Sequence, residues 1–187
     1  MRYAKTHGPE LNRVAMSART VIKERGSAVF PTKNDLSKEV RSDVIDLCDA
    51  RLADAVDLQT QMKQAHWNVK GPTFIALHEL FDKVNEDVEE YVDQIAERVV
   101  QLGGVAHGTA RHAAAHSTLS EYPAVRDGHQ HVEAVTAALA AFGKATRAAI
   151  DRADELRDKD TADIFTEISR GVDKWLWFVE AHLHADR

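Results

Sequence analysis

Apolar side chains recur every three or four residues through most of the chain, which is the spacing of helices that bury one face. The pattern predicts four long helices, over about residues 36–68, 73–102, 128–156 and 161–182. The apolar stripe of the first comprises Leu36, Val40, Val44, Leu47, Leu52, Ala55 and Leu58, and that of the second Leu77, Phe81, Val84, Val88, Val92, Ile95 and Val99. Each of these two helices would be about 45 Å long or more, the scale of a four-helix bundle.

Pro and Gly residues separate the expected helices. Asn34 or Asp35, after Pro31, is expected to cap the first helix. A tight turn at Gly71-Pro72 precedes the second helix, for which Thr73 is a plausible N-cap, and the pair Gly103-Gly104 ends it.

The connection over residues 103–127 is long for a bundle, and such a link usually crosses the bundle from one end to the other. A short helix is expected within it around Ser117–Tyr122. The sequence therefore predicts an all-α four-helix bundle with a crossover between helices two and three. The aromatic group in the fourth helix, Trp175–Phe178, is expected to serve the core and a subunit contact.

Composition narrows the class of protein. With 187 residues and 44% hydrophobic side chains, the chain can build one substantial core. The single Cys48 excludes an internal disulfide framework, fits a reducing compartment and lies among apolar neighbours, so we expect a buried, inert thiol. Neither a signal peptide nor a membrane span is evident, so the expected location is the cytoplasm.

Charge divides the chain into two parts. Residues 1–33 carry seven basic and two acidic side chains, whereas the rest of the chain has a net charge of −11. We therefore predict a basic N-terminal tail, partly helical or flexible, ahead of a bundle over residues 34–187. Such a tail suits a polyanion or an acidic neighbouring subunit. Its candidate contacts are Arg2, Lys5, Arg13, Arg19, Lys23 and Arg25.

Five side chains around the first turn and along the second helix have the chemistry to bind iron: His66, His78, Asp82, Asp93 and Glu97. His66 lies six residues before Pro72 and His78 six after it, so an antiparallel hairpin places both imidazoles at one height. Asp82 follows His78 by one helical turn, and Asp93 and Glu97 form a second pair with the same spacing.

The histidines with Asp82 and the pair Asp93 and Glu97 cannot bind one ion within one chain. Asp93 is 15 residues beyond His78, or about 22 Å along a helix, whereas metal–ligand bonds are about 2.0–2.6 Å long. A two-fold partner with this helix antiparallel would bring its Asp93 and Glu97 to the first chain's histidines, with the axis near Asp87, and would create two equal sites. The alternative is that these are ordinary solvated or hydrogen-bonded helix residues.

The segment resembles the signature of the Dps family (DNA-binding protein from starved cells), a group of ferritin-like miniferritins. The resemblance rests on His66-Trp67, His78, Asp82, the Asp93/Glu97 pair and Gln101-Leu102-Gly103-Gly104. It implies a ferritin-like bundle in a hollow dodecameric shell. It also implies ferroxidase centres of two iron ions each, between two-fold-related subunits, which oxidise Fe²⁺ preferably with hydrogen peroxide. Ferric mineral would be stored inside the shell, protecting DNA from oxidative damage.

On this resemblance, His66 and His78 are neutral imidazole ligands, and the partner's Asp93 and Glu97 hold the first iron. Asp82 is a weaker ligand to the second iron or an orienting group. Trp67 is either an electron donor or a packing residue. No Glu is followed three residues later by His, which argues against the di-iron centre of an ordinary ferritin.

Three features leave alternatives open. Asp158, Asp163 and Glu167 match acidic positions that line a three-fold pore in the family, or they simply complement a helix N-terminus. His107, His112 and His116 could bind a metal, but a solvated loop is the favoured interpretation. The alternative function is mainly non-specific DNA binding through the basic tail, which would place the protein at the nucleoid.

Overall fold

The computed structural model describes residues 30–184. All but the last four residues of the predicted tail, including its six basic candidate contacts, lie outside this range. Within it, every regular element is helical. Four long helices carry the fold: α2 (Lys38–Asn68), α3 (Phe74–Gln101), α5 (Gly128–Glu155) and α6 (Lys159–Glu180). Two short elements complete it, α4 (Ala110–His116) in the crossover and the 3₁₀ helix η1 (Ala181–Leu183) after α6.

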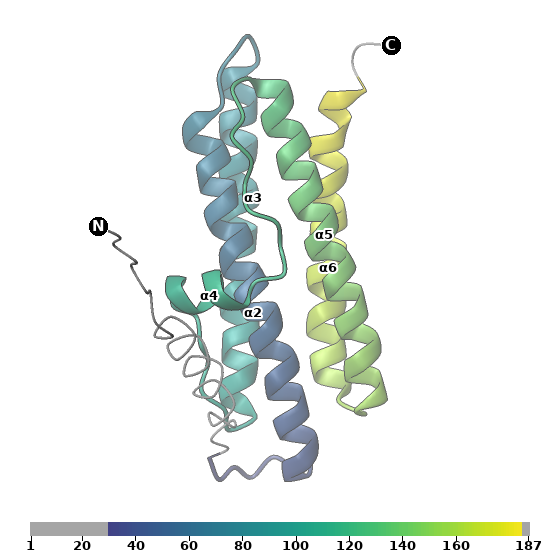
Figure 1. Ribbon diagram of the computed structural model, residues 1–187. Coiled ribbons are helices and arrows are strands. Elements are labelled where there is room, and N and C mark those ends of the chain that lie inside the picture. Colours follow the sequence, from purple (N-terminus) through teal and green to yellow (C-terminus); the bar gives the residue numbers. More distant parts are fainter. Residues whose placement is uncertain (1–29, 185–187) are drawn as a thin grey trace, which may run out of the picture.

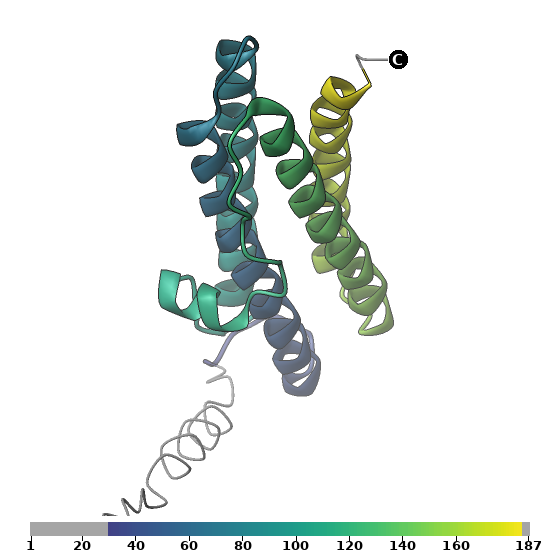
Figure 2. The ribbon, with the colours of Figure 1, turned by 45° about the horizontal axis from the view of Figure 1, so that its top comes forward.

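The long helices form two antiparallel hairpins packed side by side, α2 with α3 and α5 with α6 (Figures 1 and 2). The chain leaves α3 at one end of the bundle and runs along its length to begin α5 at the other end (Figure 1). The prediction of an all-α bundle with a crossover between its second and third long helices is thus confirmed. No helix within residues 30–184 is both long and apolar enough to span a membrane.

The predicted apolar stripes meet in one core. All four long helices contribute to it, and its largest fully buried side chains include Phe81, Phe142 and Phe165. Cys48 is also buried, and burial raises the pKa of its thiol to about 12. The thiol is therefore protonated at neutral pH, as expected of an inert core residue.

The first helix begins at a different cap from the one predicted. The side chain of Ser37 accepts a hydrogen bond from the Val40 amide, whereas Asn34 accepts one from Leu36 and so forms a turn just before the helix. Thr73 does occupy the N-cap position of α3, but its side chain makes no capping hydrogen bond.

The end of α3 explains the two adjacent glycines. Gly103 has a φ of +90°, and its neighbour Gly104 donates to the Val99 carbonyl, which closes the helix in a Schellman-type turn. A Cβ on Gly103 would lie 2.5 Å from the Phe30 carbonyl oxygen, and the Phe30 amide donates to the Gly103 carbonyl. The chain just before α2 is therefore fastened to the end of α3.

The short crossover helix is Ala110–His116, not Ser117–Tyr122 as predicted. Thr109 caps it by accepting a hydrogen bond from the His112 amide. The residues that follow α4 do not continue the helix, because they make hydrogen bonds to side chains of α2 instead. Asp54 accepts hydrogen bonds from the amide and hydroxyl of Thr118, and Asp57 accepts one from the Ser117 hydroxyl.

The aromatic group of α6 divides between two environments. Trp175 is buried and donates a hydrogen bond from its indole nitrogen to Asp87 of α3, which confirms its place in the core. Trp177 and Phe178 are exposed, at 66% and 38%. Their predicted role in a subunit contact stays a prediction.

Candidate metal centre

The α2–α3 hairpin holds His66 and His78 face to face. Their ring centroids are 3.7 Å apart and the rings stack at 20°. Each ring donates its Nδ1–H to the backbone carbonyl of the other histidine, over 2.8 Å in both cases. These reciprocal bonds orient both rings and select the tautomer in which Nε2 carries a free lone pair. Metal-binding histidines are commonly oriented in this way.

Asp82 stands beside the histidine pair, one turn further along α3. Its carboxylate is 3.8 Å from Nδ1 of His66 and forms an ion pair with Lys63 of α2. The hydrogen bond from Lys63 lowers the pKa of Asp82 and outweighs the opposing effect of burial. The carboxylate is therefore ionised and can bind a cation, although a bound metal must displace Lys63 from it. The sequence did not predict the ion pair of Lys63 with Asp82, because nothing in the local pattern shows which side chain of α2 faces Asp82.

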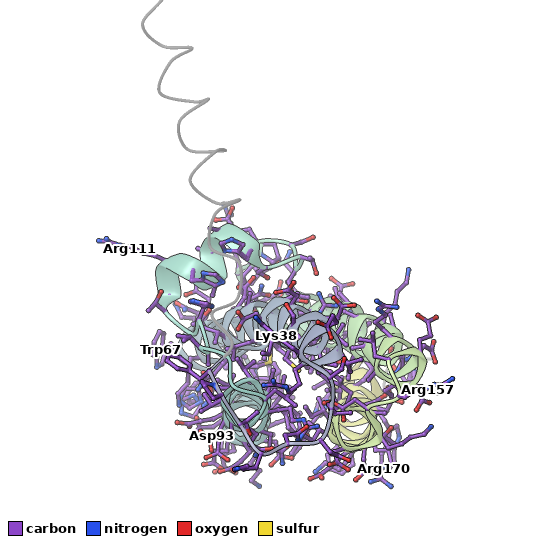
Figure 3. All side chains as sticks on the ribbon, turned by 90° about the horizontal axis from the view of Figure 1, so that it is seen from below. Lys38, Trp67, Asp93, Arg111, Arg157 and Arg170 are labelled. Carbon is purple, nitrogen blue, oxygen red and sulfur yellow. The ribbon has the colours of Figure 1, made fainter. Side chains whose placement is uncertain are left out.

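Asp93 and Glu97 are exposed on the same helix, well beyond the histidines. Figure 3 shows the labelled Asp93 at the outer edge of α3. Among residues 30–184, no three His, Cys, Asp or Glu side chains are grouped so that they could hold a metal ion. The structure pairs the rings of His66 and His78 and places Asp82 beside them, but these three do not yet converge on one point. Asp93 and Glu97 lie further along α3, as the distance argument expects.

An open groove lined by α2, α3 and the crossover borders this region. Trp67, which is 68% exposed, lines it together with Lys63 and Asn85, and Glu121 and Tyr122 of the crossover complete it. Asn85 is 5% exposed, and its Oδ1 has no hydrogen-bond partner. Sequence reasoning also missed this residue, although a polar side chain within the apolar stripe of α3 was the available signal.

Asp87, near which the two-fold axis is expected to pass, is not itself a candidate ligand. Its carboxylate accepts hydrogen bonds from the indole of Trp175 and the ammonium group of Lys174, both on α6. It is therefore committed within its own chain.

The pore assignment of Asp158 is wrong, because its side chain is buried inside the bundle. Arg98 of α3 donates to both carboxylate oxygens, over 2.8 and 2.9 Å, and the pair is 6% and 2% exposed. Asp158 also caps α6 by accepting from the amide and hydroxyl of Thr161. Burial by itself would raise the pKa of Asp158, but the hydrogen bonds from Thr161 and Arg98 together hold that pKa below its usual value.

The other two pore candidates remain available. Asp163 and Glu167 are exposed and lie one turn apart near the start of α6. Glu167 makes one long hydrogen bond, 3.4 Å from Gln94. Both carboxylates are thus accessible in the single chain, and their role at a pore stays a prediction.

The class of protein follows from the fold and from comparison with known families. Residues 45–187 match the family model of the ferritin-like domain, and the two hairpins joined by a crossover have that architecture. The chain is thus a ferritin-like protein.

Relatives narrow the class further. The chain is 46% identical over 153 residues to the DNA protection during starvation protein of Agrobacterium fabrum, a match that covers 81% of this chain and 94% of the relative. It is 35% identical to the protein of the same name from Mycolicibacterium smegmatis, over 80% and 82% of the two chains. A solved structure of Mycobacterium smegmatis Dps superposes with a TM-score of 0.80 at 33% identity, covering 84% and 96%. This chain belongs to the Dps family.

Proposed function

We propose that the protein is a ferroxidase that oxidises Fe²⁺ at centres shared between two-fold-related subunits and stores the ferric product inside a shell. The observation that carries the proposal is the pair His66 and His78, whose Nδ1 atoms are both committed to carbonyls so that both Nε2 atoms can bind a metal. Imidazole and carboxylate together suit Fe²⁺, although Zn²⁺, Co²⁺ and Mn²⁺ also bind such sets.

Each centre draws on both subunits. One chain supplies His66, His78 and Asp82, and its partner supplies Asp93 and Glu97, whose separation on α3 prevents them from serving their own histidines. Asp93 and Glu97 would hold the first Fe²⁺, with Glu97 able to bridge to the second. Asp82 would reach the second Fe²⁺ once Lys63 releases it.

The reaction needs two iron ions because hydrogen peroxide accepts two electrons. Each Fe²⁺ gives up one electron, and the oxygen–oxygen bond breaks to leave two oxygen atoms at the oxidation level of water. Pairing the electrons at one centre avoids one-electron cleavage, which would release hydroxyl radicals. The residues contribute by holding both ions in place before the oxidant arrives.

The assembly is tested by the mass of the particle. We expect twelve times the chain mass of 20.8 kDa, built from two-fold dimers, and iron that stays with the particle after loading with Fe²⁺ and peroxide. The measurement is light scattering coupled to size exclusion, with iron analysis of the same fraction. A monomer that oxidises iron at the full rate would contradict the shared centre.

Substituting Asp163 with Asn is expected to slow Fe²⁺ entry by several-fold at low ionic strength. The exposed carboxylates of Asp163 and Glu167 would attract the cation and raise its local concentration, and salt screens that attraction. The measurement is the initial rate of iron uptake across a salt series. Glu133→Gln is a matched control, because it removes the same charge near the start of α5, at the opposite end of that hairpin. Equal rates for all three proteins would mean that Asp163 only complements its helix.

DNA binding is the second candidate function, favoured by the net charge of +5 on residues 1–33 and by the relatives' name, DNA protection during starvation protein. Many tails on one shell would add their weak contacts through avidity. We expect a version lacking residues 1–29, which keeps the Phe30 contact, to lose gel-shift activity that the full chain shows at low salt and loses at high salt. Retention of that activity in the truncated protein would exclude the tail as the binding element.

A further inference from the structure

Three histidines gather on the crossover, away from the proposed ferroxidase centre. The rings of His107 and His112 stack with centroids 5.2 Å apart, and those of His112 and His116 stack at 3.9 Å. Asp49 of α2 lies beside them, with a carboxylate oxygen 2.8 Å from Nδ1 of His107. On α2, Asp49 precedes His66 by 17 residues, or about 25 Å along the helix axis.

The crossover holds this group in place independently of any ligand. Figure 3 shows α4 outside the bundle, beyond α2, with the labelled Arg111 pointing away from it. Before α4, Asp49 accepts hydrogen bonds from both the amide and the ring of His107. After α4, the fully buried Asp54 binds Thr118. Because α4 is fastened at both ends, its histidines stay close to His107.

Hydrogen bonds also prepare two of the rings as ligands. His107 donates its Nδ1–H to Asp49, and His116 donates its Nδ1–H to the His112 carbonyl over 2.8 Å. Both are left with a free lone pair on Nε2. A carboxylate behind a ligating histidine is a recurrent arrangement at metal sites. In addition, His112 and His116 have the i, i+4 spacing with which a helix presents two imidazoles to one ion.

We propose that His107, His112 and His116 form a second metal site, for a divalent late transition ion such as Zn²⁺, with Asp49 as its positioning residue. Three imidazoles suit Zn²⁺, Ni²⁺ or Cu²⁺ better than Mg²⁺ or Ca²⁺, which prefer oxygen ligands. The three rings stack and do not yet converge on one point. Within residues 30–184, no three His, Cys, Asp or Glu side chains are already arranged to hold a metal ion. The exposed ring of His116 therefore turns about its side-chain torsions when the ion binds. This site does not depend on the proposed ferroxidase function.

The test measures zinc bound by the assembled full-length protein after removal of metals. All variants carry His66→Gln and His78→Gln, so that the hairpin site does not contribute. Zinc content is measured by equilibrium dialysis against low micromolar Zn²⁺ followed by metal analysis. The background protein should bind one more Zn²⁺ per chain than the protein that also carries His112→Gln and His116→Gln. The matched control His129→Gln alters an exposed histidine at the start of α5 and should leave the zinc content unchanged.

Two further measurements sharpen the result. Asp49→Ala should weaken zinc binding by about 10–100-fold without abolishing it, because it removes only the group that orients His107. X-ray absorption of the bound zinc should show imidazole nitrogens at about 2.0–2.1 Å. If the double change prevents assembly, the zinc content of the single variant His116→Gln replaces it as the test. This variant should still fold, because the ring of His116 is exposed and Thr109 still caps α4. Unchanged zinc content in these variants, or an oxygen-dominated shell, would overturn the proposal.

Discussion

Changing Asp93 to Asn and Glu97 to Gln is expected to reduce peroxide-driven Fe²⁺ oxidation to the rate measured in buffer. The substitutions remove two anionic ligands but keep the size of both side chains. Both positions are exposed in the single chain, so the bundle should stay intact. The measurement is stopped-flow absorbance at limiting peroxide, with circular dichroism to check the helices.

A matched control lies at the start of α2, away from the expected two-fold axis near Asp87. Glu39 and Asp43 are also exposed and one turn apart, so Glu39→Gln with Asp43→Asn removes the same charge without touching the proposed ligands. This variant should keep the initial rate. An unchanged rate in the Asp93/Glu97 variant would remove these two residues from the centre.

Mixed shells test the sharing of the site directly. Subunits with His66→Gln and His78→Gln are paired with subunits that carry the Asp93/Glu97 changes, and each type is inactive by itself. A mixed dimer has one centre built from the unaltered histidines of one chain and the unaltered carboxylates of the other. Random mixing should therefore restore about a quarter of the wild-type centres. Centres contained within single chains would give no recovery.

Changing Arg98 to Met is expected to destabilise the fold by about 3–5 kcal/mol at neutral pH, because it leaves the Asp158 carboxylate buried without its partner. For a chain of this size that corresponds to a fall of about 10 °C in the apparent Tm. Scanning calorimetry of the assembled protein measures it. The double change Arg98→Met with Asp158→Asn is the control. It removes the buried charge while the amide oxygen still caps α6, so most of the stability should return.

The same pair gives a defined pH dependence. The folded-state pKa of Asp158 lies below its usual value, so its stabilising contribution is fully present above about pH 4 and is lost as the pH falls through the folded pKa. The difference in stability between wild type and Arg98→Met should therefore shrink in acid, where the carboxyl group takes up a proton. A difference that stays constant from pH 7 to pH 3 would contradict a buried ion pair.

Helical periodicity was sufficient for the architecture. Residues such as Phe81 and Val88 repeat at helical spacing and do lie in the core, because a helix with one apolar face must bury it. The hairpin spacing of His66 and His78 around Pro72 was sufficient to place their rings together, since two antiparallel helices that leave a short turn stay in register. The exposed Asp93 and Glu97 stand apart from them, as a helix rise of 1.5 Å per residue requires.

The sequence was less able to predict which of several suitable side chains makes a given hydrogen bond. Asn34, Asp35 and Ser37 are all acceptable caps, but Asn34 accepts its hydrogen bond from the Leu36 amide in a turn, and Ser37 caps the helix. The crossover helix was misplaced because Asp54 and Asp57 bind the segment that local pattern had favoured as helical.

The sequence by itself determined the four-helix architecture, the pairing of His66 with His78 and the separation of Asp93 and Glu97 from that pair, because these follow from the rise and period of a helix. Only the tertiary structure decided that Asp158 belongs to Arg98 and not to a pore, and that His107 lies against Asp49. Those pairings join residues 60 and 58 positions apart in the chain. They depend on which helix faces pack together, and local pattern carries no information about that.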